Sequence, residues 1–119
     1  MTTHGLFDLS FLEQMNDTNF TVEVISLYLK DTNQDISEMK RAFDNGSLET
    51  IHKTAHKLKS STGLLQANTL FNILDTTEKV AKSGDDGGQL GVLVAKAQRE
   101  FHLLRCALEL ELQQIQKAA

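Results

Sequence analysis

One segment restricts the possible folds most: in residues 22–43, largely apolar side chains recur at alternating intervals of three and four. The members of this repeat are Val22, Ile25, Leu29, Thr32, Ile36, Met39 and Phe43. A helix brings residues at these intervals onto one face, so the repeat predicts a long helix packed lengthwise against other helices. The chain contains no proline. Helix interiors exclude proline, and its absence favours helices throughout.

Other segments carry the same helical periodicity. The helices that they predict are a short one from Asp8 or Ser10 to about Met15, one capped by Ser47, one capped by Asn68, and a last one from about Gln89 to Gln116. Residues 1–7 are expected to be a loose lead-in. Short connections make successive long helices antiparallel. The predicted fold is therefore all-α, an up-down antiparallel four-helix bundle with a short additional N-terminal helix, in a single domain over residues 1–119.

Composition and charge narrow the class of protein. The formal net charge of −4 argues against a nucleic-acid-binding protein, which needs a basic face. No apolar stretch is long enough to span a bilayer, and the N-terminus lacks a secretory pattern. The single cysteine cannot form an internal disulfide, which fits a reducing compartment. We therefore expect a cytoplasmic monomer that binds neither nucleic acid nor membrane.

His56 is predicted to lie on the solvent-facing side of the helix that follows Ser47. At about 100° per residue, the apolar residues of this helix share one arc, and His56 points roughly 130° away from its middle. The neighbours of His56 on the same helix are cationic, small or hydroxylated, and they are His52, Lys53, Lys59, Ser60 and Gly63. Such a setting suits an imidazole that meets an anionic group brought by another molecule. The acidic residues of the chain are expected to form solvated helix faces.

A metal site is the competing chemical interpretation. His52 and His56 are four residues apart, with Glu49 one turn earlier, so they could share a metal ion. The spacing is not the His-Glu-x-x-His motif, and no second pair of ligands is visible on another helix. We therefore predict no metal site in this chain. An ordinary surface histidine is the remaining alternative for His56.

The segment His56-Lys57-Leu58-Lys59-Ser60-Ser61 resembles the His-x-Leu-Lys-Gly-Ser signature of histidine-containing phosphotransfer (HPt) domains, the four-helix-bundle modules of multistep phosphorelays. The order of helices across nearly the whole chain resembles the family too. Two positions depart from the family pattern. Ser60 and Gln66 stand where the family usually has glycine, and Ser60 is still small enough to leave His56 accessible.

This resemblance implies a function for the site. His56 would accept a phosphoryl group from a receiver-domain aspartate of a hybrid sensor kinase and pass it to the receiver domain of a response regulator. Lys59 would offset the phosphate charge, and Ser60 would leave room or donate a hydrogen bond. The receiver domain would supply the aspartate and the divalent metal, so no cofactor is expected on this chain. No segment resembles an ATP-binding or kinase catalytic sequence, so we expect a phosphocarrier and not an enzyme.

The resemblance also implies a docking surface, because in the family apolar residues of the first two helices contact the receiver domain. The candidates are Phe11, Met15 and Phe20, with Lys57 and Gly63 close to His56. These apolar residues are more than one seam can bury, although they could simply pack the short helix onto the bundle. A second stripe, which includes Val24 and Leu27, is expected to lie under that short helix. The alternative function is a helical bundle that docks receiver domains without carrying phosphate.

Overall fold

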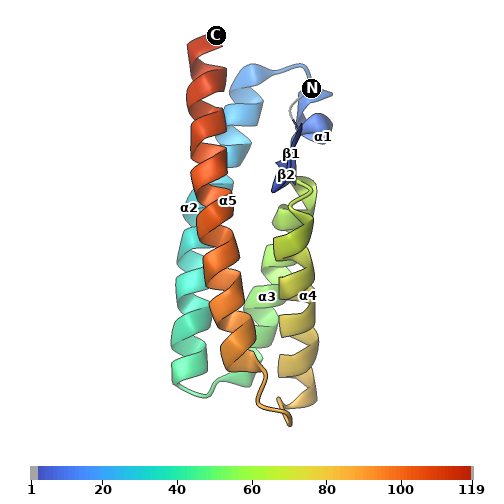
Figure 1. The fold of residues 1–119 in the computed structure, drawn as a ribbon, viewed down its shortest axis with the longest axis vertical. Helices are drawn as coiled ribbons and strands as arrows, with labels where there is room; N and C mark the ends of the chain where they lie inside the picture. The colour runs from blue at the N-terminus through green and yellow to red at the C-terminus, as the bar shows by residue number, and fades with distance from the viewer. Residues whose placement is uncertain (1–2, 119) are drawn as a thin grey trace.

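The structure, a computed structural model, describes residues 3–118. Its elements are β1 Thr3–His4, β2 Phe7–Asp8, α1 Ser10–Glu13, α2 Thr18–Asp44, α3 Leu48–Leu64, α4 Asn68–Ser83 and α5 Leu90–Ala118. The four long helices run alternately up and down, as Figure 1 shows. Each packs beside the next, and α5 returns to pack against α2, so they enclose one core. The predicted all-α, up-down bundle is confirmed.

The predicted seam of α2 faces this core in part, because Val22, Leu29 and Phe43 are only half-buried and Thr21, Tyr28 and Ala42 complete the buried face. Ile25, Thr32, Ile36 and Met39 are buried there. The other three helices contribute buried leucines to the same core. Examples are Leu58 of α3, Leu74 of α4 and Leu104 of α5, each 2% exposed or less. Among residues 3–118, no helix combines the length and the apolar character that crossing a membrane requires.

The N-terminal segment fills the end of the bundle that the two shorter helices leave open. Helices α2 and α5 have 27 and 29 residues, whereas α3 and α4 have 17 and 16. The segment lies beyond the ends of α3 and α4, beside the remaining length of α2 and α5 (Figure 1). Its side chains Phe7, Leu9 and Leu12 are buried and extend the core. It therefore closes the bundle at this end.

The prediction of a loose lead-in was wrong for residues 3–7, and residues 1 and 2 lie outside the described chain. β1 and β2 pair in antiparallel register, and the amide of Asp8 donates to the carbonyl of Leu65 at 2.9 Å. Burial of Phe7 fixes this segment in place. Helix α1 is also shorter than predicted, since it ends at Glu13 and Asn16 takes a left-handed φ of +53°.

The turns at the two ends of α3 set how it meets its neighbours. Gly46, with a φ of +73°, lies between α2 and α3, as its sequence position predicts. Ser47 occupies the N-cap position of α3, but its hydroxyl donates to Thr50 Oγ1 and accepts no capping hydrogen bond from a backbone N–H of the helix. The prediction that Asn68 caps α4 was wrong, because Ala67 holds that position. Gln66 reverses the chain with a φ of +51°, so α4 begins at once and the α3–α4 connection is short.

Candidate functional site

His56 lies near the middle of α3 and points into solvent. The opposite face of α3 buries Ile51, Ala55 and Leu58 in the core, so the helical period turns the imidazole outward. The His56 side chain is 71% exposed. An exposed imidazole on a rigid helix is available to a reactant that arrives on another molecule.

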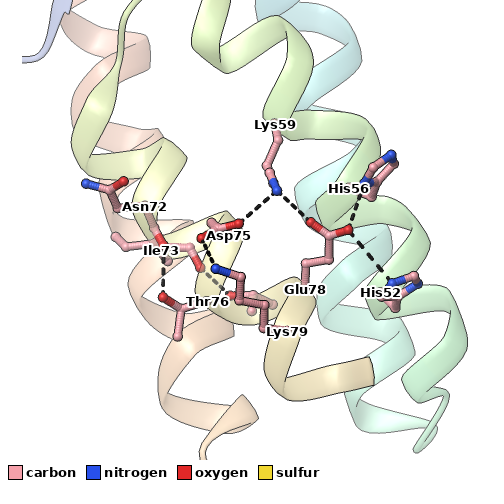
Figure 2. A network of polar contacts seen from close by, with 10 residues as sticks. His52, His56, Lys59, Asn72, Ile73, Asp75, Thr76, Glu78 and Lys79 are labelled. Atoms are coloured by element: carbon pink, nitrogen blue, oxygen red, sulfur yellow. Dashed lines mark hydrogen bonds and ion pairs between the residues drawn. The ribbon is translucent and has the colours of Figure 1, made fainter. Parts of the chain in front are cut away.

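Glu78 of α4 contacts the ring of His56. Glu78 Oε2 lies 2.7 Å from His56 Nδ1, although the two residues are 22 positions apart in the chain (Figure 2). The short turn after α3 sends α4 back alongside it, which brings these positions to the same level. A carboxylate only accepts hydrogen bonds, so Nδ1 carries the proton and donates it. The lone pair of the neutral ring is then on Nε2, the nitrogen on the side away from Glu78.

Lys59 lies one turn beyond His56 and is held between two acids of α4. Its Nζ is 2.8 Å from Asp75 Oδ1 and 2.8 Å from Glu78 Oε1. It also lies 5.7 Å from the centre of the Phe71 ring. The other oxygen of Asp75 accepts from Lys79 Nζ at 2.9 Å. A continuous chain of polar contacts therefore runs from the imidazole through Glu78, Lys59 and Asp75 to Lys79 (Figure 2).

These contacts fix the charge of each member. The hydrogen bond from Lys59 lowers the pKa of Glu78 from its usual value, against the opposing effect of burial. Hydrogen bonds from Lys59 and then Lys79 lower the pKa of Asp75 in the same way. In return, Asp75 first and Glu78 second raise the pKa of Lys59. Both acids are therefore carboxylates and Lys59 is an ammonium group at neutral pH.

His52 is a weaker neighbour of the same carboxylate. Its Nε2 is 3.8 Å from Glu78 Oε2, too long for a hydrogen bond. Glu49, the third group of the metal site considered above, pairs with Lys53 at 2.9 Å. Among the side chains described, no group of three or more histidine, cysteine, aspartate or glutamate residues is placed to hold a metal ion.

The other residues singled out near His56 lie on two different sides of α3. Lys57 and Ser60 line a groove of about 320 Å³ between α3 and α2. Lys57 Nζ crosses it to contact Asp35 Oδ2 of α2 at 3.1 Å. Gly63 is on the α4 side, where a Cβ would lie 3.5 Å from the Phe71 ring, an ordinary contact. Ser60 therefore lies both one turn from His56 and at the edge of the groove.

The predicted apolar docking residues are exposed but distant from His56. Phe11, Met15 and Phe20 are all exposed. Because Asp35 of α2 lies level with Lys57, Phe20 is about four turns, or about 22 Å, further along the bundle. Leu27 and Leu64 lie between the level of His56 and that of Phe20, and both border the groove. Leu27 is 56% exposed. The expectation that the short helix covers this stripe was wrong for Leu27, since α1 has only four residues.

Sequence reasoning missed the two acids of α4. They were expected to be solvated, yet the Glu78 side chain is only 14% exposed and contacts both His56 and Lys59. Their signal in the sequence is their distance from the turn after α3. In an antiparallel pair, residues equally far from the turn lie opposite one another, which matches Glu78 with His56 and Asp75 with Lys59.

Comparison with known proteins gives two matches. The family model of the Hpt domain matches residues 23–118. The fold is similar to the crystal structure of histidine-containing phosphotransfer protein B (HptB) from Pseudomonas aeruginosa PAO1, with a TM-score of 0.85. The alignment covers 94% of this chain and 98% of that chain at 19% sequence identity. No curated protein matches the sequence.

Proposed function

This chain belongs to the family of Hpt domains and is a histidine phosphotransfer protein, and from that premise we propose that His56 is its phosphoacceptor. The donor is the phosphorylated aspartate of a receiver domain in a hybrid sensor kinase. The recipient is the receiver domain of a response regulator. The chain acts as a carrier between them, and any divalent metal ion comes with the receiver domain.

The observation that carries this proposal is the contact between Glu78 and His56 Nδ1. It leaves the Nε2 lone pair directed away from Glu78, on a side chain that is 71% exposed. In the transfer, an Nε2–P bond forms and the P–O bond of the aspartyl phosphate breaks. The electron pair of that bond leaves with the partner's carboxylate. The proton stays on Nδ1, so the ring gains a positive charge that the Glu78 carboxylate stabilises.

Lys59 and Ser60 have supporting roles in this proposal. Phosphoryl transfer depends mainly on positioning and on stabilisation of charge. The ammonium group of Lys59 and the imidazole contact the same carboxylate of Glu78, and the flexible lysine side chain can turn from there toward a phosphoryl group on Nε2. Ser60, exposed one turn after His56, leaves space for the phosphoryl group and offers a hydroxyl donor.

For the docking surface we propose the groove between α2 and α3 and the exposed residues that continue from it. The groove begins at Lys57 and Ser60 and reaches Leu27 and Leu64. Phe11, Met15 and Phe20, which are exposed nearer the end of the bundle, are included in this proposed surface. A modest apolar contact with a polar rim suits a carrier, which must release each partner after the transfer.

The test mixes the protein with a ³²P-labelled receiver domain and measures acid-labile label on the protein. We expect uptake by the wild type, none by His56→Gln, and reduced uptake by His52→Gln. Label that persists in His56→Gln would contradict the assignment. Receiver binding without any label on the wild type would instead indicate a docking module that carries no phosphate.

A further inference from the structure

Asp75 belongs to the polar chain of the site but does not contact His56. Its hydrogen bonds go to Lys59 and Lys79, at 2.8 and 2.9 Å. Glu78, by comparison, contacts both the imidazole and Lys59. What Asp75 changes is therefore the environment of Lys59 and, through it, the charge near His56.

The charges around Lys59 are balanced before any phosphoryl group arrives. Lys59 and Lys79 contribute two positive charges, and Asp75 and Glu78 contribute two negative charges. The Lys59 side chain is 22% exposed, and its ammonium group lies 5.7 Å from the centre of the Phe71 ring and contacts both carboxylates. A phosphoryl dianion on His56 meets a cation that is already neutralised. Glu78 is needed at Nδ1, which leaves Asp75 as the acid that competes with the phosphoryl group.

We propose that Asp75 is a positioning residue that competes with the phosphoryl group for the ammonium of Lys59, and so makes phosphohistidine at His56 less stable and easier to transfer. This inference rests on the proposed function, because it takes His56 as the phosphoacceptor. As the Nε2–P bond forms and the partner's P–O bond breaks, a phosphoryl oxygen replaces Asp75 Oδ1 as the acceptor from Lys59. Asp75 keeps its contact with Lys79. The exchange reverses when the phosphoryl group leaves.

The substitution Asp75→Asn tests this competition, because it removes the charge and keeps an acceptor oxygen. The other variants are Lys59→Gln and the double variant. Asp44→Asn is the matched control, since Asp44 is also in an exposed i, i+4 ion pair, with Lys40 on α2. Each protein is phosphorylated with the small-molecule donor phosphoramidate, and the loss of phosphohistidine is followed by ³¹P NMR. The equilibrium with a phosphorylated receiver domain is measured separately.

We expect Asp75→Asn to shift the equilibrium toward phosphohistidine by about fivefold and to slow its hydrolysis. A fivefold shift corresponds to about 1 kcal/mol, the net size of one typical hydrogen bond, here the one that Lys59 Nζ gives to Asp75 Oδ1 before transfer and to a phosphoryl oxygen after it. Lys59→Gln should shift both measurements the other way. In the Lys59→Gln background, Asp75→Asn should have no further effect, because Asp75 acts through Lys59. Asp44→Asn should match the wild type.

Three results would overturn the inference: no change in Asp75→Asn, a shift away from phosphohistidine, or an equal effect with and without Lys59. Structural damage does not imitate the expected result, because a disturbed site would shorten the lifetime of phosphohistidine. Failure of the proposed function is a separate outcome, in which the wild type exchanges phosphate with no receiver domain. The hydrolysis comparison with phosphoramidate needs no receiver and decides the role of Asp75 in that case too.

Discussion

Replacing Glu78 by Ala tests how the imidazole of His56 is held. The 2.7 Å contact from Nδ1 to Oε2 is a hydrogen bond to a charged acceptor, a class that contributes about 1.5–3 kcal/mol. It strengthens during transfer because the ring becomes cationic. We therefore expect Glu78→Ala to raise the barrier by up to about 1.5–3 kcal/mol and to slow phosphate uptake by up to roughly 10- to 150-fold. Glu78→Gln keeps an acceptor without its charge and should lose about half of this free energy.

The assay measures initial rates of label uptake from a phosphorylated receiver domain and, by ¹⁵N NMR, which ring nitrogen of His56 carries the proton. The wild type should show the proton on Nδ1, and Glu78→Ala should show a mixture of the two forms. Glu49→Gln is the control, since Glu49 also lies near His56 in sequence but pairs with the exposed Lys53. The free energy of unfolding of Glu78→Ala should fall by no more than the about 1.5–3 kcal/mol of the lost hydrogen bond, and this variant should stay folded because Lys59 keeps Asp75. Wild-type uptake by Glu78→Ala with an unchanged ring proton would refute the reasoning.

Two further predictions concern pH and docking. The pKa values of the carboxyl groups around Lys59 are lowered, so their contribution to stability is present above the ordinary carboxyl range and is lost as the pH falls below about 4. The raised pKa of Lys59 keeps the contribution intact up to about pH 10. The stability difference between wild type and Lys59→Met, measured by urea unfolding, should therefore be constant from about pH 5 to 9; a difference that grows below about pH 4 would contradict this. Leu27→Ser should weaken receiver binding in calorimetry more than Phe20→Ser, because Leu27 borders the groove near His56; equal effects would point to a contact centred on the end of the bundle.

The helices and the exposure of His56 could be predicted because both follow from spacing within one helix. Thr32 and Met39 lie on the buried face of α2 and His56 lies opposite the buried face of α3, as the period of 3.6 requires. The N-terminal segment could not be predicted in this way. Phe7 and Leu9 are too few to show a period, and they are buried because α2 and α5 extend past the two shorter helices.

The acids of the site lay beyond the prediction for a different reason. In the sequence, Glu78 and Asp75 are simply polar residues outside the apolar stripe of a helix. Periodicity within that helix does not tell whether such a residue faces solvent or a neighbouring helix. What distinguishes them is the length of the turn between α3 and α4, which Gln66 shortens by its left-handed conformation. The site depends on the register between α3 and α4, and the turn that joins the two helices sets that register.

This dependence on register explains what the bundle contributes to the chemistry. Moving α4 by one residue relative to α3 would rotate Glu78 by about 100° and carry it away from His56 Nδ1. The same movement would separate Lys59 from Asp75, so both contacts of the polar chain are lost together. The buried layer beneath, with Leu58 of α3 and Leu74 of α4, opposes such a slip because it would expose apolar side chains. The apolar core thus fixes the register that places Glu78 at Nδ1, and this contact determines which ring nitrogen of His56 carries the proton. The imidazole stays exposed to large partners while its Nε2 lone pair is free to react.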